Sequence, residues 1–189
     1  MGKYVKIIES LLQYPIEEEW FEFKENWFDP HEIGEYISAL SNAAALKGKS
    51  NAYFVWGIND VTHEILGTNI NYQKDIKNEP FQHYLARAVA PDIGFSFHEV
   101  EINGKRLVVL DIPAAAKAPT AFAGQRYIRI GSSKESVAKY PEREAQLFDV
   151  LRNGLPSICN TVSEYQDLSF ERLFTYYAGR GISLKNETF

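Results

Sequence analysis

The feature that most constrains the fold is residues 52–58, an unbroken run of apolar residues with the sequence AYFVWGI. A strand with one face in water alternates apolar and polar residues, so an unbroken run predicts a strand that is covered on both faces. Such a strand lies in the middle of a sheet. Asn59 and Asp60 follow directly and end the strand in a turn. We therefore expect an α/β (α+β) fold, in which a mixed β-sheet is packed with about four helices.

Four segments carry the signals of amphipathic helices. The clearest start is Asp29-Pro30, an N-cap acid followed by proline at the first helical position, with Glu32 in the first turn. Apolar side chains then recur every three or four residues, which predicts one buried stripe and leaves three polar residues away from it. The stripe comprises Ile33, Ile37, Leu40 and Ala44, and the polar residues are Ser38, Ser41 and Asn42. The other helices are predicted over residues 3–13, 80–89 and 141–152.

Alternation and turn residues predict the remaining strands. Residues 20–24 alternate, which places Trp20, Glu22 and Lys24 on one face of a strand. Residues 95–102 and 105–112 flank Asn103-Gly104, a dipeptide that accepts positive φ at both positions and so indicates a tight type I′ hairpin. We expect a short strand at residues 65–66, a loop outside the sheet at 113–125, and a last strand at 127–130.

The length of 189 residues allows one sizeable core and is too short for two full domains. We expect one domain over residues 1–154, and a linker with the start of a truncated C-terminal region over 155–189, where residues 167–174 predict a helix. Cys159 is the single cysteine, which favours a reducing compartment and a cytoplasmic protein. No apolar run is long enough to span a bilayer, so we expect no membrane partner.

The net charge of −5 argues against a strongly basic nucleic-acid clamp, but the charges are unevenly distributed. Residues 1–36 contain three lysines and nine acids, whereas residues 104–143 contain eight lysines and arginines and only three acids. Ordinary solvated surface accounts for such a pattern. Alternatively, residues 104–143 gather their positive charge on one face and bind a polyanion.

Four short motifs recur in order between about residues 15 and 150. They are Glu22-Phe23-Lys24 on the first strand, ISALSN at residues 37–42, WGIND at 56–60 and YIRIGSS at 127–133. Together they resemble the Schlafen/AlbA-like DNA-binding domain family, which occurs at the N-terminus of prokaryotic transcriptional regulators and in Schlafen proteins. The family often has a glycine pair after the helix asparagine, whereas residues 43–50 predict a longer connection here. The resemblance implies a Schlafen AlbA-like fold and a nucleic-acid-binding module of a multidomain regulator, with DNA favoured over RNA.

The last strand and the turn after it offer donors for phosphate groups. Arg129 and the turn Gly131–Lys134 supply guanidinium, hydroxyl and backbone N–H groups, which hold a phosphate without reading base sequence. A solvated strand end is the alternative. Further cations would extend this surface and steepen the salt dependence of binding. The candidate nucleic-acid-binding residues are Lys24, Lys47, Lys49, Arg126, Arg129, Ser132, Ser133 and Lys134.

A divalent-metal-dependent endoribonuclease is the alternative function. Schlafen-type ribonucleases have a site of two glutamates and one aspartate, and the resemblance implies Glu17, Glu22 and Asp60 as candidate catalytic and metal-binding residues. Such carboxylates suit Mg²⁺ or Mn²⁺, which lowers the pKa of bound water. Glu17, Glu18 and Glu19 are consecutive, so the sequence leaves open which takes the first position. An exposed ion pair between Glu22 and Lys24, worth about 0–1 kcal/mol, is the simpler explanation of that motif.

A protein-interaction or homo-oligomerisation module is the third class of function, because a family resemblance identifies a fold more safely than an activity. The sequence has no GxxxxGK[ST] element, so a Walker-type ATP site is unsupported. The four histidines have neither metal-ligand spacing nor a nearby cysteine, which argues against a zinc site.

Overall fold

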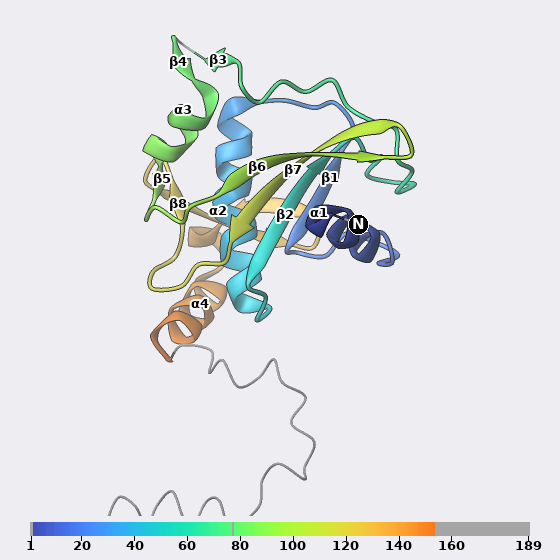
Figure 1. Ribbon diagram of the computed structural model, residues 1–189. Helices are drawn as coiled ribbons and strands as arrows, with labels where there is room; N and C mark the ends of the chain where they lie inside the picture. Colours follow the sequence, from blue (N-terminus) through green and yellow to red (C-terminus); the bar gives the residue numbers. More distant parts are fainter. Residues whose placement is uncertain (1, 77, 154–189) are drawn as a thin grey trace, which may run out of the picture. The chain divides into compact units, whose positions relative to one another are not determined.

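The central sheet has four strands in the order β1-β2-β7-β6, with the apolar strand β2 inside it (Figure 1). The computed structural model describes residues 2–76 and 78–153. β1 runs parallel to β2, and the other two pairings are antiparallel. The strands are β1 (Phe21–Lys24), β2 (Asn51–Trp56), β6 (Ser96–Ile102) and β7 (Lys105–Pro113). The mixed α+β fold class is confirmed.

Helices cover both faces of the central sheet. α1 (Lys3–Leu11) lies on one face, where the Tyr4 hydroxyl donates a hydrogen bond of 3.0 Å to Asp111 of β7. α2 (Pro30–Leu46) lies on the other face, where the rings of Tyr36 and Phe54 have centroids 5.2 Å apart. Because both faces are covered, β2 needs apolar side chains in both directions, which explains the unbroken run.

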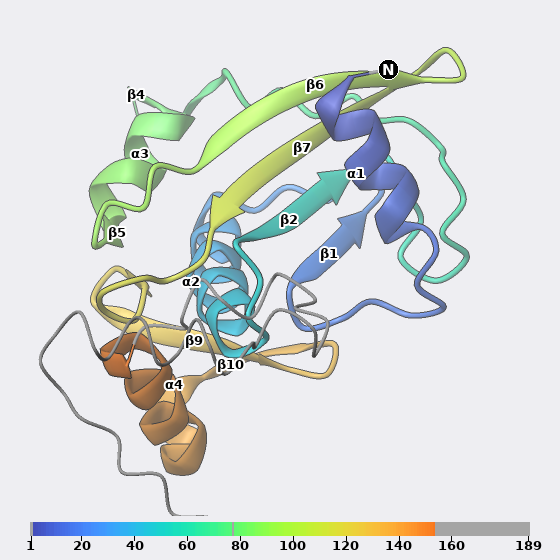
Figure 2. The ribbon, with the colours of Figure 1, turned by 60° about the horizontal axis from the view of Figure 1, so that its bottom comes forward.

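A second sheet covers the opposite side of α2, so the helix lies between two sheets (Figure 2). This sheet is antiparallel, in the order β10-β9-β8-β5. Its strands are β5 (Val89–Ala90), β8 (Ala121–Phe122), β9 (Gln125–Ile130) and β10 (Ser133–Ser136). The expectation of a single buried stripe on α2 is therefore wrong: Ser38, Ser41 and Asn42 lie off the stripe, but they have no exposed surface.

Polar side chains of α2 fasten the second sheet to the helix through a set of contacts that we call the polar seam (Ser38, Ser41, Asn42, Thr120 and Tyr127). Ser38 Oγ accepts a hydrogen bond from the Tyr127 N–H, and the Asn42 amide donates to the Tyr127 carbonyl. Asn42 also exchanges hydrogen bonds with the backbone N–H and C=O of Thr120, both at 2.8 Å. Thus the helix side chains satisfy backbone groups that a neighbouring strand would otherwise satisfy.

The local capping and turn signals of the sequence are confirmed. The Asp29 carboxylate accepts hydrogen bonds of 2.9 Å from the N–H groups of His31 and Glu32, as an N-cap should. Asn103 and Gly104 have φ values of +53° and +72°, the conformation that a type I′ hairpin requires. The predicted helices at 80–89 and 141–152 are α3 (Phe81–Ala88) and α4 (Pro141–Asn153).

Four sequence-based expectations need correction. Residues 65–66 form only an isolated bridge between Ile65 and Ile58. The segment 113–125 contains β8, and the strand at 127–130 is followed by β10, so it is not the last. α2 continues to Leu46, which shortens the connection predicted at residues 43–50. A β3–β4 pair (Asp75–Ile76 with Glu79–Pro80) and a 3₁₀ turn (Val137–Lys139) were not expected.

The predictions made for residues 154–189, including the domain boundary and the helix at 167–174, lie outside the described residues. Within the described part of the chain, none of the helices is long and apolar enough to cross a membrane.

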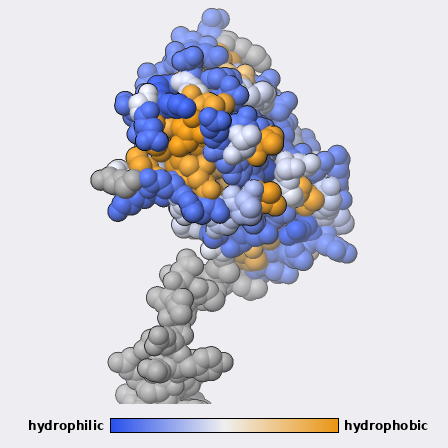
Figure 3. All heavy atoms as spheres, turned by 90° about the vertical axis from the view of Figure 1, so that its right-hand side faces the viewer, coloured by the Kyte–Doolittle hydropathy of each residue, from blue (hydrophilic) through white to orange (hydrophobic). Residues whose placement is uncertain are grey.

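Figure 3, the right-hand side of Figure 1, shows hydrophobic residues gathered in a patch with hydrophilic residues around it. Ile16 and Val61 are among the exposed large hydrophobic residues.

Gly34 of α2 tests whether the second sheet presses directly on the helix. A Cβ atom at this position would lie 2.1 Å from Cε2 of the buried Phe122 ring in β8. We therefore expect Gly34→Ala to lower the free energy of unfolding by about 1–3 kcal/mol, as overpacking does. In a Phe122→Ala background, Gly34→Ala should instead raise the free energy of unfolding by about 0.5–1 kcal/mol. The clash with the ring is then absent, and alanine is more favourable than glycine inside a helix. Urea unfolding of the four proteins measures both effects; the same sign in both backgrounds would contradict this packing.

Candidate functional site

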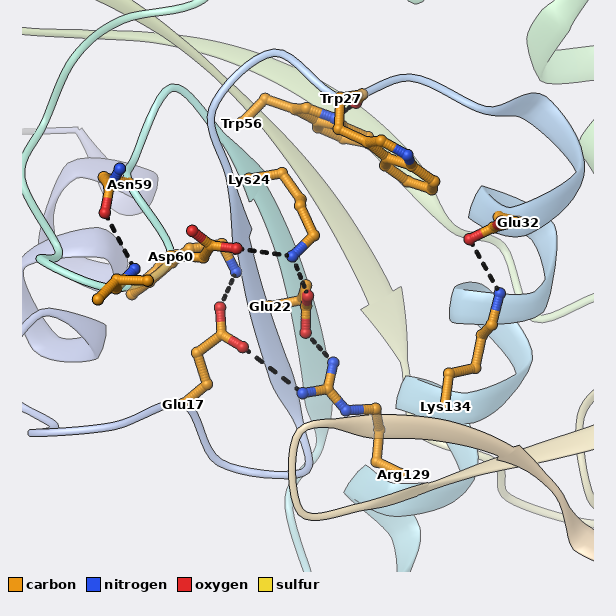
Figure 4. Close-up of polar contacts among 12 residues, drawn as sticks. Glu17, Glu22, Lys24, Trp27, Glu32, Trp56, Asn59, Asp60, Arg129 and Lys134 are labelled. Carbon is orange, nitrogen blue, oxygen red and sulfur yellow. Dashed lines mark hydrogen bonds and ion pairs between the residues drawn. The ribbon is translucent and has the colours of Figure 1, made fainter.

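Arg129 of β9 is the centre of a chain of ion pairs that crosses from the second sheet to the central sheet (Figure 4). Its side chain has no exposed surface, and Nη1 contacts Oε2 of Glu22 in β1. Nη2 lies 3.5 Å from Oε2 of Glu17 and makes no hydrogen bond within the described residues. Burial lowers the pKa of Arg129, and the neighbouring Glu17 carboxylate counteracts this. The guanidinium thus faces carboxylates in the interior.

Lys24 and Asp60 continue the chain of ion pairs toward the surface. Lys24 Nζ lies 2.7 Å from Glu22 Oε1 and 3.2 Å from Asp60 Oδ2. Asp60 is held by the turn after β2, where the Asn59 side chain accepts hydrogen bonds from the N–H groups of Val61 and Thr62. The Glu22 side chain is only 3% exposed, so the expectation of an exposed Glu22–Lys24 pair is wrong. We call Glu17, Glu22, Lys24, Asp60 and Arg129 the ion-pair chain.

Glu17 is the one of the three consecutive glutamates that joins the ion-pair chain. Its Oε1 atom accepts a hydrogen bond of 2.6 Å from the Phe23 N–H of β1. Burial raises the pKa of Glu17 above its ordinary 4.5, although the Phe23 N–H and the Arg129 charge both lower it. Glu19 instead turns toward α2 and α4, where it meets Lys47 and Arg143. Glu17, Glu22 and Asp60 thus all belong to the ion-pair chain, linked to one another through Arg129 and Lys24.

The ion-pair chain does not fit a divalent metal in the arrangement observed. Arg129 lies between Glu17 and Glu22, and Lys24 lies between Glu22 and Asp60, so cationic side chains occupy the places between the carboxylates. Among residues 2–76 and 78–153, no group of three or more His, Cys, Asp or Glu side chains is placed to hold a metal ion. A metal would have to displace Lys24 or Arg129 from buried or half-buried carboxylates.

Lys134 is turned inward as well. From β10 it contacts Glu35 of α2 and lies 3.5 Å from Glu32, with only 13% of its side chain exposed. Tyr127 donates a hydrogen bond of 2.7 Å to the same Glu35 carboxylate. Burial and the Glu35 carboxylate raise the pKa of Tyr127 to about 12. Burial also acts to raise the pKa of Glu35, but Lys134 and Tyr127 outweigh it, and the net pKa is lowered.

The turn between β9 and β10 is exposed and lies beside the end of α2. Gly131 in this turn donates its N–H to Glu19 Oε1 at 3.3 Å, and Lys47 at the C-cap of α2 lies 3.2 Å from Glu19 Oε2. Arg143 of α4 lies 3.6 Å from Oε1 of the same carboxylate. Lys49 stacks its ammonium over the Trp20 ring at 4.8 Å. Lys49 therefore lies in a hollow that it shares with α1 rather than beside the turn. We call Lys47, Arg143 and the exposed Ser132 and Ser133 the turn surface.

The candidate cations do not form one surface. Lys47 lies at the turn surface, and Lys49 lies over the Trp20 ring. Arg129 and Lys134 are directed inward by carboxylates of the central sheet and α2. Arg129 is therefore not in the surface position expected for a phosphate contact or a solvated strand end. Arg126, at the other end of β9, pairs with Glu144 of α4. The basic residues of 104–143 are consequently spread among several ion pairs rather than gathered on one face.

Sequence reasoning missed Arg143 and the role of Glu19. Arg143 lies in the helix predicted over residues 141–152, with Glu142 and Glu144 beside it, so its local sequence has no net positive charge. Its partner Glu19 lies in the acidic N-terminal segment, more than one hundred residues away in the chain. Only the placement of α4 against α2 and the β9–β10 turn reveals this contact.

The buried position of Arg129 predicts a large cost of its removal. Arg129→Met leaves the Glu22 and Glu17 carboxylates buried without their guanidinium, and we expect the free energy of unfolding to fall by about 3–5 kcal/mol. Arg126→Met, on the same strand, removes a half-exposed pair and should cost less than about 1 kcal/mol. Chemical denaturation of both variants measures the difference. Equal costs would show that burial does not decide the contribution of these two arginines.

The raised pKa of Glu17 predicts a pH dependence of stability. An acid whose pKa is raised by folding holds its proton more tightly in the folded state, so stability falls as the pH rises from the unfolded value through the folded one. Glu17→Gln cannot lose a proton. We expect the wild type to lose stability relative to Glu17→Gln as the pH rises from about 4.5, its ordinary value. Urea unfolding between pH 4 and 7 tests this, with Glu18→Gln as the matched control. The prediction is contradicted if the difference in free energy of unfolding between the wild type and Glu17→Gln stays constant or moves in favour of the wild type as the pH rises.

Comparisons with known proteins concern the domain as a whole: its family and the solved structures that it resembles. The model of the family described as Schlafen, AlbA_2 matches residues 17–138. Among solved structures, the DIP2311 protein from Corynebacterium diphtheriae is similar at 17% identity and a TM-score of 0.47, covering 74% of this chain and 28% of that one. The N-terminal domain of a RecG-related protein from Nitrosomonas europaea is similar at 21% identity and a TM-score of 0.44, covering 71% and 93% of the two chains. No curated protein gives a significant match. The family model spans well over half of the residues, and the chain belongs to the Schlafen AlbA_2 family.

Proposed function

We propose that this domain binds nucleic acid, with DNA ahead of RNA, and serves as the DNA-binding module of a multidomain transcriptional regulator in the cytoplasm. Membership of the Schlafen AlbA_2 family supports a role connected with nucleic acid. The observation that carries the proposal is the turn surface, where cations from α2 and α4 meet the exposed β9–β10 turn. Ammonium, guanidinium, hydroxyl and backbone N–H groups are the donors that proteins use toward phosphate.

The turn surface favours contact with the phosphate backbone over base recognition. Lys47 and Arg143 have 40% and 38% of their side chains exposed, so each can reach a ligand without unfolding. Ser132 and Ser133 are exposed next to them and add hydroxyl donors. These groups carry no base-specific pattern. With two cations at the turn surface, the logarithm of the affinity should fall with the logarithm of salt at a slope of about −2.

Fluorescence anisotropy of labelled duplex DNA, single-stranded DNA and structured RNA across a salt series tests this proposal. We expect Lys47→Met to bind duplex DNA more weakly and to reduce the salt slope by about 1. Lys74→Met is the matched control, since Lys74 lies over the Phe28 ring just before α2, at the opposite end of the helix from Lys47. Absence of binding to every probe would refute the proposal, and a control variant as weak as Lys47→Met would refute the site.

A divalent-metal-dependent endoribonuclease is the second candidate. The observation that favours it is that Glu17 and Glu22, from the segment of β1, share one chain of ion pairs with Asp60 from the turn after β2. Their ion pairs with Lys24 and Arg129 oppose it, because the carboxylates are already neutralised. The probes of the binding experiment should be checked for cleavage with Mg²⁺ or Mn²⁺ present. RNA cleavage that is lost in both Glu22→Gln and Asp60→Asn would establish the nuclease. Intact probes would refute the nuclease and leave nucleic-acid binding as the proposed function.

A further inference from the structure

We propose that Glu19 is an internal competitor for a phosphate group at the turn surface. The inference rests on the proposed nucleic-acid binding and adds to it one phosphate position and the residue that restrains it. The Glu19 carboxylate is surrounded by donors from three separate parts of the fold. Those donors are the ammonium of Lys47, the guanidinium of Arg143 and the backbone N–H of Gly131.

This donor set suits a phosphate as well as a carboxylate. Lys47 Nζ approaches one carboxylate oxygen at 3.2 Å, and the Gly131 N–H and Arg143 Nη2 approach the other at 3.3 and 3.6 Å. A phosphodiester likewise presents two non-bridging oxygens that accept hydrogen bonds and share one negative charge. Lys47, Arg143 and Gly131 lie at the end of α2, in α4 and in the β9–β10 turn, and Glu19 belongs to none of these elements. The fold therefore brings the three donors together independently of Glu19.

The contacts of Glu19 are weak enough to be exchanged. Lys47 and Arg143 are more than a third exposed, whereas the Glu19 side chain is 12% exposed. Because both cations face water, we place these pairs near the exposed class, which contributes about 0–1 kcal/mol. Glu19 lies in the turn before β1, outside any helix or strand. Rotation of its side chain would therefore release both cations without breaking backbone hydrogen bonds of the sheets. By contrast, Glu17 and Glu22 are held by the buried Arg129.

The surface hollow beside Arg143 can hold a nucleoside attached to the phosphate. Arg143 lines a surface hollow of about 420 Å³, together with Ile130 and Tyr140. Ile130 is the last residue of β9, directly before Gly131. An aromatic side chain beside a phosphate position is a common platform for a nucleobase. The hollow thus favours a nucleic-acid strand over an isolated inorganic anion as the natural ligand.

Glu19→Gln tests the inference, with Glu18→Gln as the matched control that removes the same charge one residue away. We expect Glu19→Gln to bind duplex DNA more tightly, on the order of tenfold, as one added charge-assisted contact allows. Its salt slope should be steeper by about 1, because one more phosphate is neutralised. Glu18→Gln should show neither change. Equal gains in both variants would overturn the inference, because they would reflect net charge alone.

A second readout separates this inference from the proposed function. Inorganic phosphate is titrated into ¹⁵N-labelled protein, and the Gly131 amide signal is followed. We expect a saturable shift in Glu19→Gln at phosphate concentrations that leave the wild type and Glu18→Gln unchanged, and its loss when Lys47→Met and Arg143→Met are added. No Gly131 response in Glu19→Gln overturns the inference even where DNA binds. A Gly131 response without DNA binding by any variant supports the anion site and refutes the proposed function.

Discussion

The burial of α2 between two sheets is the constraint on which the rest of this structure depends. A helix covered on both sides cannot rely on one apolar stripe, so its second side must offer a surface of another kind. Here that surface is the polar seam, in which serine and asparagine side chains bond the backbone of residues 120 and 127. Buried polar groups of this sort are tolerated only when their hydrogen bonds are made, and the seam makes them.

The polar seam determines where the functional residues lie. Because Ser38 and Asn42 hold the N–H and C=O groups of Tyr127, they also fix the position of Arg129 two residues later on β9. Arg129 then reaches across to Glu22 of β1, and the β9–β10 turn that follows is placed beside Lys47 at the end of α2. The ISALSN and YIRIGSS motifs are therefore two halves of one contact between the helix and the second sheet. The EFK motif supplies the carboxylate and the ammonium that receive Arg129 and Asp60.

The sequence predicts the parts of this fold that have local causes. The strand at 52–58, the Asp29 cap and the Asn103-Gly104 hairpin each depend on neighbouring residues, and the structure contains all three. The second sheet was missed because β5 and β8 have two residues each, too few to show any alternation. The inward direction of Arg129 was missed because its partner Glu22 is 107 residues away in the chain. Glu17, Glu22 and Asp60 were grouped through family resemblance, and neither their spacing nor their local sequence indicates that cations lie between them.

The distribution of charge between interior and surface bears on the negative net charge of the chain. Glu17, Glu22 and Glu35 all have their charges directed inward, to Arg129, Lys24 and Lys134, and these pairs contribute little to the field that a ligand meets at the turn surface. There Lys47 and Arg143 are opposed directly by Glu19. A polyanion responds to the charges within about 10 Å, the distance over which salt screens at 0.1 M. The affinity of this surface for phosphate should therefore depend on Glu19 far more than on the whole-chain charge of −5.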